Sequence, residues 1–302
     1  MPKRKRVEAR PDQPEKKAST QSNLKLDGSI TKRDETTSSD VEHFKIPSKS
    51  KDINCERRGR DEKPHLIWTH GAGGGLSNAA TKDFAEGFAE ISSVVSFQGS
   101  MNLTGRVRSF ETILEHENVK CALGGRSMGK QYPWHGPVST TTNSQTGARA
   151  AVMSAQRPEA GIKAVVLVSY PLIGAQKGDV RDQILLDLPE GVDVLFMSGT
   201  NDSMCDLAHL RRVMKKMKAR TWLVEVQGAD HGMSLKPKSG TEPMTKRTGR
   251  VAAEWLADRE RSKSHCSLTW NGQSREVLST GWQPGPEQVK DDGYTQDDGQ
   301  GV

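Results

Sequence analysis

The chain has 302 residues, of which 33% are hydrophobic and 27% are charged, and its formal net charge is +6. A hydrophobic share of this size excludes a chain that is disordered throughout. No apolar stretch approaches the ~20 residues that span a bilayer, so we expect no membrane-spanning helix. The four cysteines are widely spaced and form no C-x-x-C pair, so the sequence predicts neither a zinc site nor a disulfide framework.

Both ends of the chain are polar and are predicted to be tails. Residues 1–42 are rich in Lys, Arg, Glu, Ser, Thr and Pro without apolar periodicity, and we expect them to be disordered. Their PKRKR stretch is typical of a nuclear-import signal and equally of a solvated charge run, so we expect a cytoplasmic or nuclear protein. Because the positive charge belongs mostly to this tail, we expect no specific nucleic-acid binding. Residues 261–302 are predicted to form the second tail.

Between the tails, residues 43–260 alternate between strand-like and helix-like segments. The strand candidates are short and β-rich, and cover residues 43–46, 53–58, 65–70, 93–98, 120–125, 163–170, 192–199 and 221–228. Helical patterns fall between them, at residues 81–90, 107–116, 148–156, 207–217 and 250–260. This alternation predicts an α/β fold, with a mostly parallel sheet and helices on both faces. Ligand sites in such sheets lie at the carboxyl ends of the strands.

A G-x-S-x-G pattern, from Gly125 to Gly129, lies at the end of one of these strand candidates. Small residues on both sides of the serine permit a tight strand-to-helix turn that holds the hydroxyl clear of the sheet. Ser127 is therefore a candidate nucleophile. The pattern alone also fits a serine that caps a helix, so the surrounding sequence has to decide between the two interpretations.

A glycine-rich turn, from His70 to Gly75, lies at the end of the strand candidate at residues 65–70. Glycines here allow backbone N–H groups to face a ligand, and the backbone of Ala72 and Gly73 is a candidate for one half of an oxyanion hole. The N–H of Met128, directly after the candidate nucleophile, is the candidate for the other half. A phosphate-binding loop is disfavoured, because no G-K-[ST] follows the glycines.

A serine nucleophile needs a base that is itself held by an acid. Asp202 and His231 each follow a later strand candidate, so both are expected at the same edge of the sheet as Ser127. The chain order of serine, acid and histidine is that of α/β-hydrolases. Asp206 and Asp230 are weaker alternatives for the acid.

The motifs HGAGGG, GGRSMG, ARAA, SYPL, LFMSGTND and GADHG together resemble the α/β-hydrolase-like family of testis-expressed protein thirty, over about residues 43–260. That family includes the third subunit of the nuclear NSL histone acetyltransferase complex and is related to dienelactone hydrolases. The resemblance implies an α/β-hydrolase fold and carries over Ser127, Asp202 and His231 as triad positions.

Two functions are consistent with these residues. The first is a serine hydrolase that acts on an ester, thioester or lactone carbonyl of a small acyl substrate and needs no metal or organic cofactor. The second is a non-catalytic module that binds protein partners in a nuclear complex, which the import-like motif and the chromatin branch of the family favour. Met128, Tyr170, Leu172 and Met233 are candidates for lining the acyl pocket, although a core role is the stronger interpretation for each.

One segment departs from the family pattern. The helix should follow GGRSMG directly, yet residues 130–147 intervene before ARAA. We hypothesise that this segment is translated intron, because Gly129-Lys130 can be encoded with a splice-donor sequence and Gln145-Thr146-Gly147 with an acceptor. The alternative is a genuine surface loop. In either case we expect the added residues to misplace Ser127 and the Met128 N–H, and so to lower activity.

Overall fold

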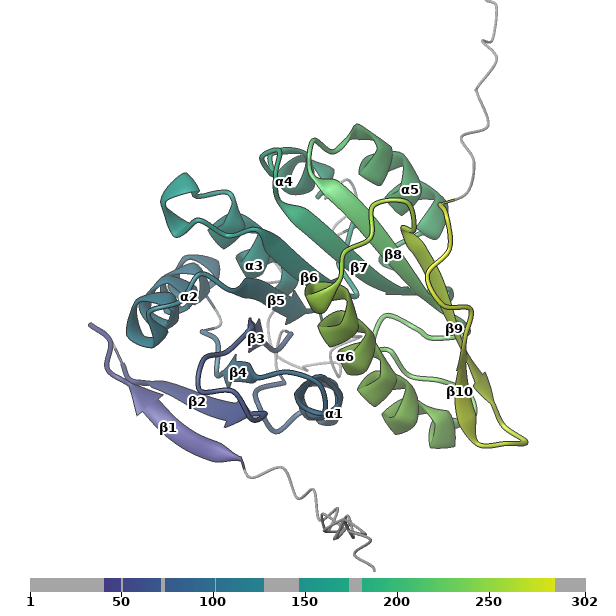
Figure 1. Ribbon diagram of the computed structural model, residues 1–302, viewed down its shortest axis with the longest axis horizontal. Coiled ribbons are helices and arrows are strands. Elements are labelled where there is room, and N and C mark those ends of the chain that lie inside the picture. The colour runs from purple at the N-terminus through teal and green to yellow at the C-terminus, as the bar shows by residue number, and fades with distance from the viewer. Residues whose placement is uncertain are drawn as a thin grey trace, which may run out of the picture. The chain divides into compact units, whose positions relative to one another are not determined.

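The computed structural model describes residues 41–49, 51–71, 74–100, 102–127, 147–173 and 181–285 (Figure 1). Its strands are β1 Glu42–Ile46, β2 Ile53–Arg58, β3 Leu66–Thr69, β4 Val94–Phe97, β5 Ala122–Arg126, β6 Ala164–Val168, β7 Asp193–Gly199, β8 Arg220–Val226, β9 His265–Asn271 and β10 Glu276–Ser279. They form one 10-stranded sheet in the order β1-β2-β4-β3-β5-β6-β7-β8-β9-β10.

The centre of the sheet, from β4 across to β9, is parallel. In the described residues, the antiparallel pairs are β1 with β2 and β2 with β4 at one edge, and β9 with β10 at the other. Every residue of β6 and β7 is buried, as expected for strands that are covered on both faces. The predicted fold class, a mostly parallel sheet with helices on both faces, is confirmed.

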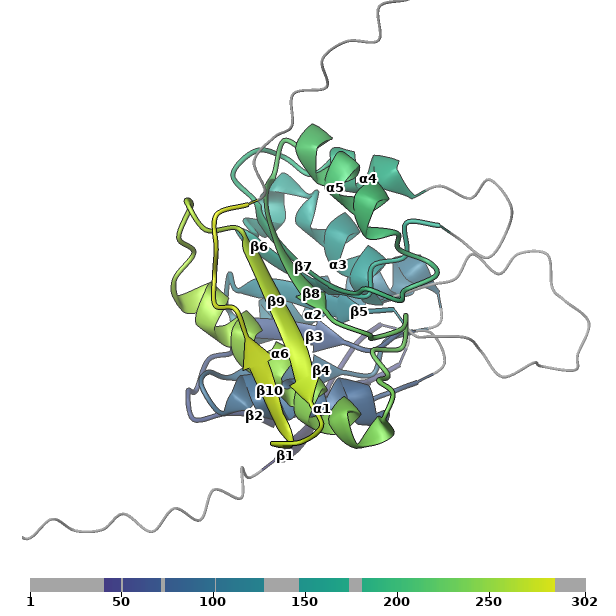
Figure 2. The same ribbon diagram turned by 90° about the vertical axis from the view of Figure 1, so that its right-hand side faces the viewer.

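The helices form a layer on each side of the sheet (Figures 1 and 2). They are α1 Ala79–Ala89, α2 Leu103–Glu117, α3 Gly147–Ala155, α4 Asp182–Leu186, α5 Leu207–Lys216 and α6 Thr241–Ala257, with short 3-10 turns at Pro158–Ala160 and Lys238–Gly240. Apolar side chains of α1 and α6 belong to one buried cluster, whereas those of α2, α3, α4 and α5 belong to the other. Each layer therefore has its own core against the sheet.

Helices α1 and α6 cross at backbone contact, because each contributes a glycine to the crossing. A Cβ placed on Gly249 would lie 2.7 Å from the backbone nitrogen of Phe88, and one on Gly87 would overlap the carbonyl group of Lys246. No real Cβ approaches backbone atoms so closely. The two glycines therefore set the distance between these helices.

Two sequence-based boundaries are wrong. Helix α6 begins at Thr241 rather than at residue 250, because its first half buries small polar side chains such as Thr245 and Thr248, which carry no apolar period. Residues 261–302 are not all tail, since β9 and β10 extend the sheet. In β9, buried Cys266 and Leu268 alternate with less buried residues, so the strand has the polarity of a half-covered sheet edge.

Other expectations for the ends of the chain stay as predictions. Residues 1–40, which include the PKRKR stretch, lie outside the described residues, and β1 begins at Glu42. In the described part of the chain, no helix combines the length and apolar character needed to cross a membrane.

The topology fixes where a ligand site belongs. The chain leaves β3 for β4 on one side, and it leaves the neighbouring β5 for β6 on the other side. Such a reversal opens a crevice at the carboxyl ends of the two strands. His70 follows β3 and Ser127 follows β5, so both lie at this point.

Candidate active site

Ser127, His231 and Asp202 meet at the carboxyl edge of the sheet. Ser127 comes directly after β5, and its Oγ lies 2.8 Å from Nε2 of His231. Nδ1 of the same ring lies 2.8 Å from each carboxylate oxygen of Asp202. The carboxylate accepts a hydrogen bond from the Nδ1–H group, which leaves the Nε2 lone pair free to accept a hydrogen bond from the serine hydroxyl. The three side chains that were predicted to converge from distant parts of the sequence do so.

The backbone around each member of this group is specified locally. The backbone N–H of Ser127 donates to the carbonyl of Val168 at 3.0 Å, so the serine stays in register with β6. Asp202 accepts a hydrogen bond from the N–H of Met204 at 2.8 Å, which orients its carboxylate. All three side chains are buried, with residue exposures of 1% for Ser127, 6% for Asp202 and 5% for His231.

The alternative acids have other partners. Asp206 is the N-cap of α5 and accepts from the N–H of His209 at 2.7 Å. Asp230 accepts from the N–H groups of Gly232 and Ser234 at 2.8 and 2.9 Å, and so stabilises the turn that carries the histidine. Asp202 is therefore the acid that the geometry favours. The alternative interpretation of Ser127 as a helix cap is not supported, because its hydroxyl is bonded to the imidazole.

A buried arginine joins the serine turn to the histidine turn. Arg126 donates from Nε to the carbonyl of Ser127 at 3.1 Å and from Nη2 to the carbonyl of Gly232 at 3.0 Å. Its exposure is 2%, and burial lowers the pKa of its guanidinium to about 10. Because a guanidinium is planar and rigid, two donors on one head fix the spacing of two carbonyls. Sequence analysis did not single out this residue.

The glycine turn after β3 begins at a histidine with a defined tautomer. Nε2 of His70 faces the N–H of Gly99 at 2.9 Å, so this nitrogen must be the acceptor. Nδ1 then carries the proton and donates to the carbonyl of Gly71 at 2.6 Å. Burial, followed by the nearby charge of Arg106, lowers the pKa of His70 to about 4. The imidazole is therefore neutral at pH 7.

Two further side chains brace the same turn. Gln98 donates from Nε2 to Nε2 of His70 at 3.0 Å, and its Oε1 accepts from the N–H of Leu76 at 3.2 Å. Arg106, which is fully buried, donates to the carbonyls of His70 and Ser100 at 2.6 and 2.9 Å. Gln98 thus spans the two ends of the glycine turn. Gln98 stands at the end of the strand predicted at residues 93–98, and this position could have indicated a role at the site, but the sequence analysis did not consider it.

The predicted oxyanion donors Ala72, Gly73 and Met128 lie outside the described residues. Of the residues considered for the acyl pocket, Tyr170, Leu172 and Met233 are buried at 0–2% exposure within the apolar clusters, so the core interpretation is confirmed for them.

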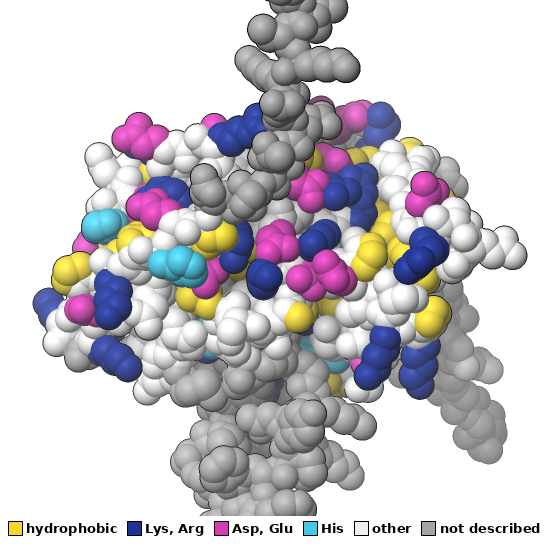
Figure 3. Space-filling model, turned by 90° about the horizontal axis from the view of Figure 1, so that it is seen from below, with side chains coloured by type: hydrophobic (Ala, Val, Ile, Leu, Met, Phe, Trp, Pro, Cys, Tyr) yellow, Lys and Arg dark blue, Asp and Glu magenta, His cyan; other side chains and the backbone are white. Residues whose placement is uncertain are grey.

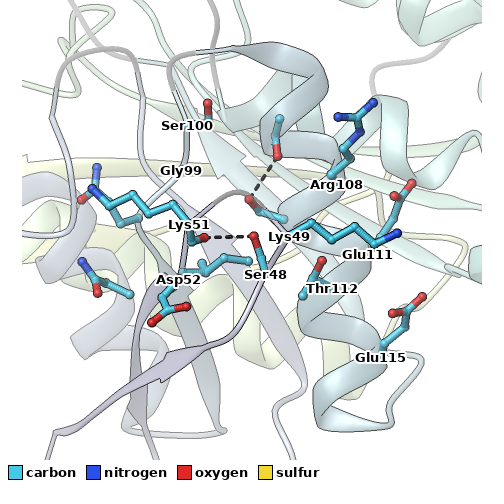
Figure 4. Close-up of a pocket in the computed structure, with 15 residues that line it drawn as sticks. Ser48, Lys49, Lys51, Asp52, Gly99, Ser100, Arg108, Glu111, Thr112 and Glu115 are labelled. Atoms are coloured by element: carbon cyan, nitrogen blue, oxygen red, sulfur yellow. Dashed lines mark hydrogen bonds between the residues drawn. The ribbon is translucent and has the colours of Figure 1, made fainter.

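A separate hollow of about 930 Å³ lies between the β1–β2 connection and α2 (Figure 4). Its lining carries charges of both signs: Lys49, Lys51 and Arg108, together with Asp52, Glu111 and Glu115. None of the three triad positions lines it. The face drawn in Figure 3 likewise mixes acidic and basic side chains rather than gathering one sign.

A mostly parallel sheet with serine, histidine and aspartate at its carboxyl edge defines a protein of α/β-hydrolase architecture. Comparison with protein-family models matches residues 100–258, more than half of the chain, to the family described as "Alpha/beta hydrolase domain". The chain therefore belongs to the α/β hydrolase domain family.

Solved structures agree on the fold. Est1E from Butyrivibrio proteoclasticus is 15% identical with a TM-score of 0.52, covering 72% of this chain and 99% of its own. Dienelactone hydrolase from Anabaena variabilis is 13% identical with a TM-score of 0.52, covering 72% and 97%. The esterase domain of a Rhodothermus marinus protein is 13% identical with a TM-score of 0.51, also covering 72% and 97%. At such identities the likeness concerns the fold alone.

Proposed function

We propose that the protein is a serine hydrolase that cleaves an ester, thioester or lactone through Ser127, His231 and Asp202. The observation that carries the proposal is the distance of 2.8 Å between Oγ of Ser127 and Nε2 of His231, with Asp202 on the opposite nitrogen. A serine hydroxyl that is hydrogen-bonded to an imidazole, which is in turn held by a carboxylate, is an activated nucleophile.

In the proposed reaction, Oγ of Ser127 attacks the acyl carbon while Nε2 of His231 takes the hydroxyl proton. The tetrahedral intermediate collapses when the imidazolium returns that proton to the leaving oxygen or sulfur, which leaves an acyl-enzyme. Water then attacks the acyl carbon by the same route, which releases the carboxylic acid and regenerates the Ser127 hydroxyl. Asp202 stabilises the imidazolium throughout. The backbones of Met128, Ala72 and Gly73 are proposed as the oxyanion donors.

The names of proteins with a similar solved structure support the proposed chemistry. Solved structures of this fold include one titled an esterase domain and one titled a dienelactone hydrolase. As part of the proposal, we assign the chain to the group of testis-expressed protein thirty within the broader family, because its motifs HGAGGG and GGRSMG resemble those of that group.

The proposal is tested with a fluorophosphonate probe, which labels only an activated serine. The full chain should be labelled, and Ser127→Ala should abolish labelling. Asp202→Asn should slow labelling by at least about 10³-fold, because the amide no longer fixes the imidazole tautomer. Asp230→Asn is the matched control and should label within about threefold of the unchanged chain, since its role is confined to the turn. Labelling that survives Ser127→Ala would refute the proposal.

A non-catalytic role is the second candidate, and burial is the observation that favours it. Ser127 is only 1% exposed, as a core residue would be. In this case the domain would bind protein partners in the nucleus, to which the PKRKR stretch would direct it. A folded chain that no fluorophosphonate labels, together with a nuclear location that is lost when PKRKR is deleted, would favour this role over hydrolysis.

A further inference from the structure

The strand-to-helix turn at the candidate nucleophile raises the question of which glycine completes it. In a G-x-S-x-G turn, small residues stand two positions before and two positions after the serine, because the strand and helix backbones touch there. The first of these is Gly125. By sequence the second is Gly129, but helix α3 begins only at Gly147.

Gly147 lies directly against Gly125. A Cβ built on Gly125 would be 2.5 Å from the carbonyl oxygen of Gly147 and 2.7 Å from the backbone nitrogen of Ala148. These neighbours are backbone atoms, which cannot move aside as the end of a flexible side chain can. The last residues of β5 and the first residues of α3 are thus in backbone contact, although many residues separate them along the chain.

Gly147 is also confined on its other side. A Cβ on it would be 2.6 Å from the carbonyl oxygen of His70 and 2.8 Å from that of Thr69. The carbonyl of His70 is the one that buried Arg106 holds at the start of the glycine turn. Gly147 therefore sits between the two turns that carry the candidate oxyanion donors and the candidate nucleophile. Only a residue without a side chain fits there.

From these contacts we propose that Gly147 is the positioning residue that completes the nucleophile turn, in the place that the sequence motif gives to Gly129. The join between β5 and α3 is made through space at Gly147. That Gly147 positions a nucleophile rests on the proposed function. That Gly147 makes the contact between β5 and α3 rests on packing alone. It has a simple corollary: removing residues 130–147 leaves Ser-Met-Gly-Ala-Arg, the same chain as removing residues 129–146, so the surviving glycine takes the same place.

The test replaces the glycines with alanine one at a time, first in the full chain and then in a chain that lacks residues 130–147. In the full chain, Gly147→Ala should lower the thermal midpoint by at least about 5 °C and slow fluorophosphonate labelling at least about tenfold at a temperature where the variant is folded. Gly129→Ala is the matched control and should change the midpoint by less than about 1 °C and labelling by less than about twofold.

In a chain that lacks residues 130–147, the requirement should transfer. There Gly129→Ala should cause the losses that Gly147→Ala causes in the full chain. If Gly147→Ala fails to fold while Gly129→Ala folds normally, the packing assignment is supported.

Two results would overturn the inference: harm from Gly129→Ala in the full chain, or full tolerance of Gly147→Ala. Absence of labelling in the unchanged chain would refute the hydrolase proposal, but the comparison of thermal midpoints would still decide the role of Gly147. Failure of the proposed function and failure of this inference are therefore distinguishable.

Discussion

Replacing Arg126 with methionine tests whether the buried arginine positions the candidate nucleophile. The change removes two charge-assisted hydrogen bonds, to the carbonyls of Ser127 and Gly232, each worth about 1.5–3 kcal/mol. It also removes a buried charge. Burial lowers the pKa of Arg126 to about 10, a shift that corresponds to about 3 kcal/mol of relieved desolvation. The two effects oppose each other, so the free energy of unfolding should fall by no more than about 3 kcal/mol.

The loss of kcat/KM in Arg126→Met should be larger than the loss of stability alone would cause. Without the guanidinium, the serine and histidine turns lose the two hydrogen bonds that join them, and a displacement of about 1 Å in a reacting group costs about 10²-fold in rate. We expect kcat/KM for an activated ester to drop about 10- to 100-fold in Arg126→Met. Arg126→Lys should recover little of it, because a single ammonium group does not reproduce the fork.

A second buried arginine supplies the control. Arg58 is 5% exposed and pairs with Glu56 and Glu86, away from the triad. Arg58→Met should lower the urea midpoint of unfolding while kcat/KM of the folded protein stays within about twofold. If Arg126→Met reduces stability as much as Arg58→Met does but leaves kcat/KM unchanged, the positioning role is wrong.

Three further changes have defined outcomes. The pKa of folded His70 is about 4, below its value of about 6.5 in an unfolded chain, so the unfolded state binds the proton first. Stability due to this group is complete above pH 6.5 and is lost as the pH falls to 4, by about 3 kcal/mol in urea titrations, and His70→Gln should flatten that slope. Removing residues 130–147 should raise ester turnover at least about tenfold, and equal turnover of both forms would count against the predicted effect. Gly87→Ala should cost about 1–3 kcal/mol of unfolding free energy by forcing α1 away from α6, whereas Gly272→Ala, whose Cβ would meet no atom closer than 3.9 Å, should cost under about 0.5 kcal/mol.

The centre of the sheet was predictable from sequence because strands that are buried on both faces consist of continuous apolar runs. AVVLV in β6 is such a run. The edge was not predictable in the same way, since β10 has no buried residue and its composition is that of a polar tail. Helix α4, with only five residues, is too short to show a period.

The triad was predictable because parallel strands bring their carboxyl ends to one edge, so chain order and strand ends suffice. The side chains that brace the triad were not, since Arg126 and Arg106 bind backbone carbonyls of distant turns, and a carbonyl carries no sequence signal. A charged residue inside a glycine-rich buried strand was nevertheless a clue at Arg126. An arginine with 2% exposure must have hydrogen-bond acceptors. Arg126 finds them in the backbone carbonyls at the carboxyl edge of the sheet.

The expected displacement of Ser127 by the added residues is not observed, since its Oγ lies 2.8 Å from the imidazole. The physical reason is that the contact between β5 and α3 depends on packing rather than on chain continuity. Lengthening a connection from about two residues to about twenty raises its closure cost by only about 2 kcal/mol. A domain with 5–15 kcal/mol of stability can absorb that loss, so the fold survives a longer connection. The chemistry is more demanding, because an oxyanion donor must be placed within a fraction of an ångström. We therefore expect residues 130–147 to alter turnover far more than thermal stability, and a shortened chain that gained stability without gaining activity would contradict this expectation.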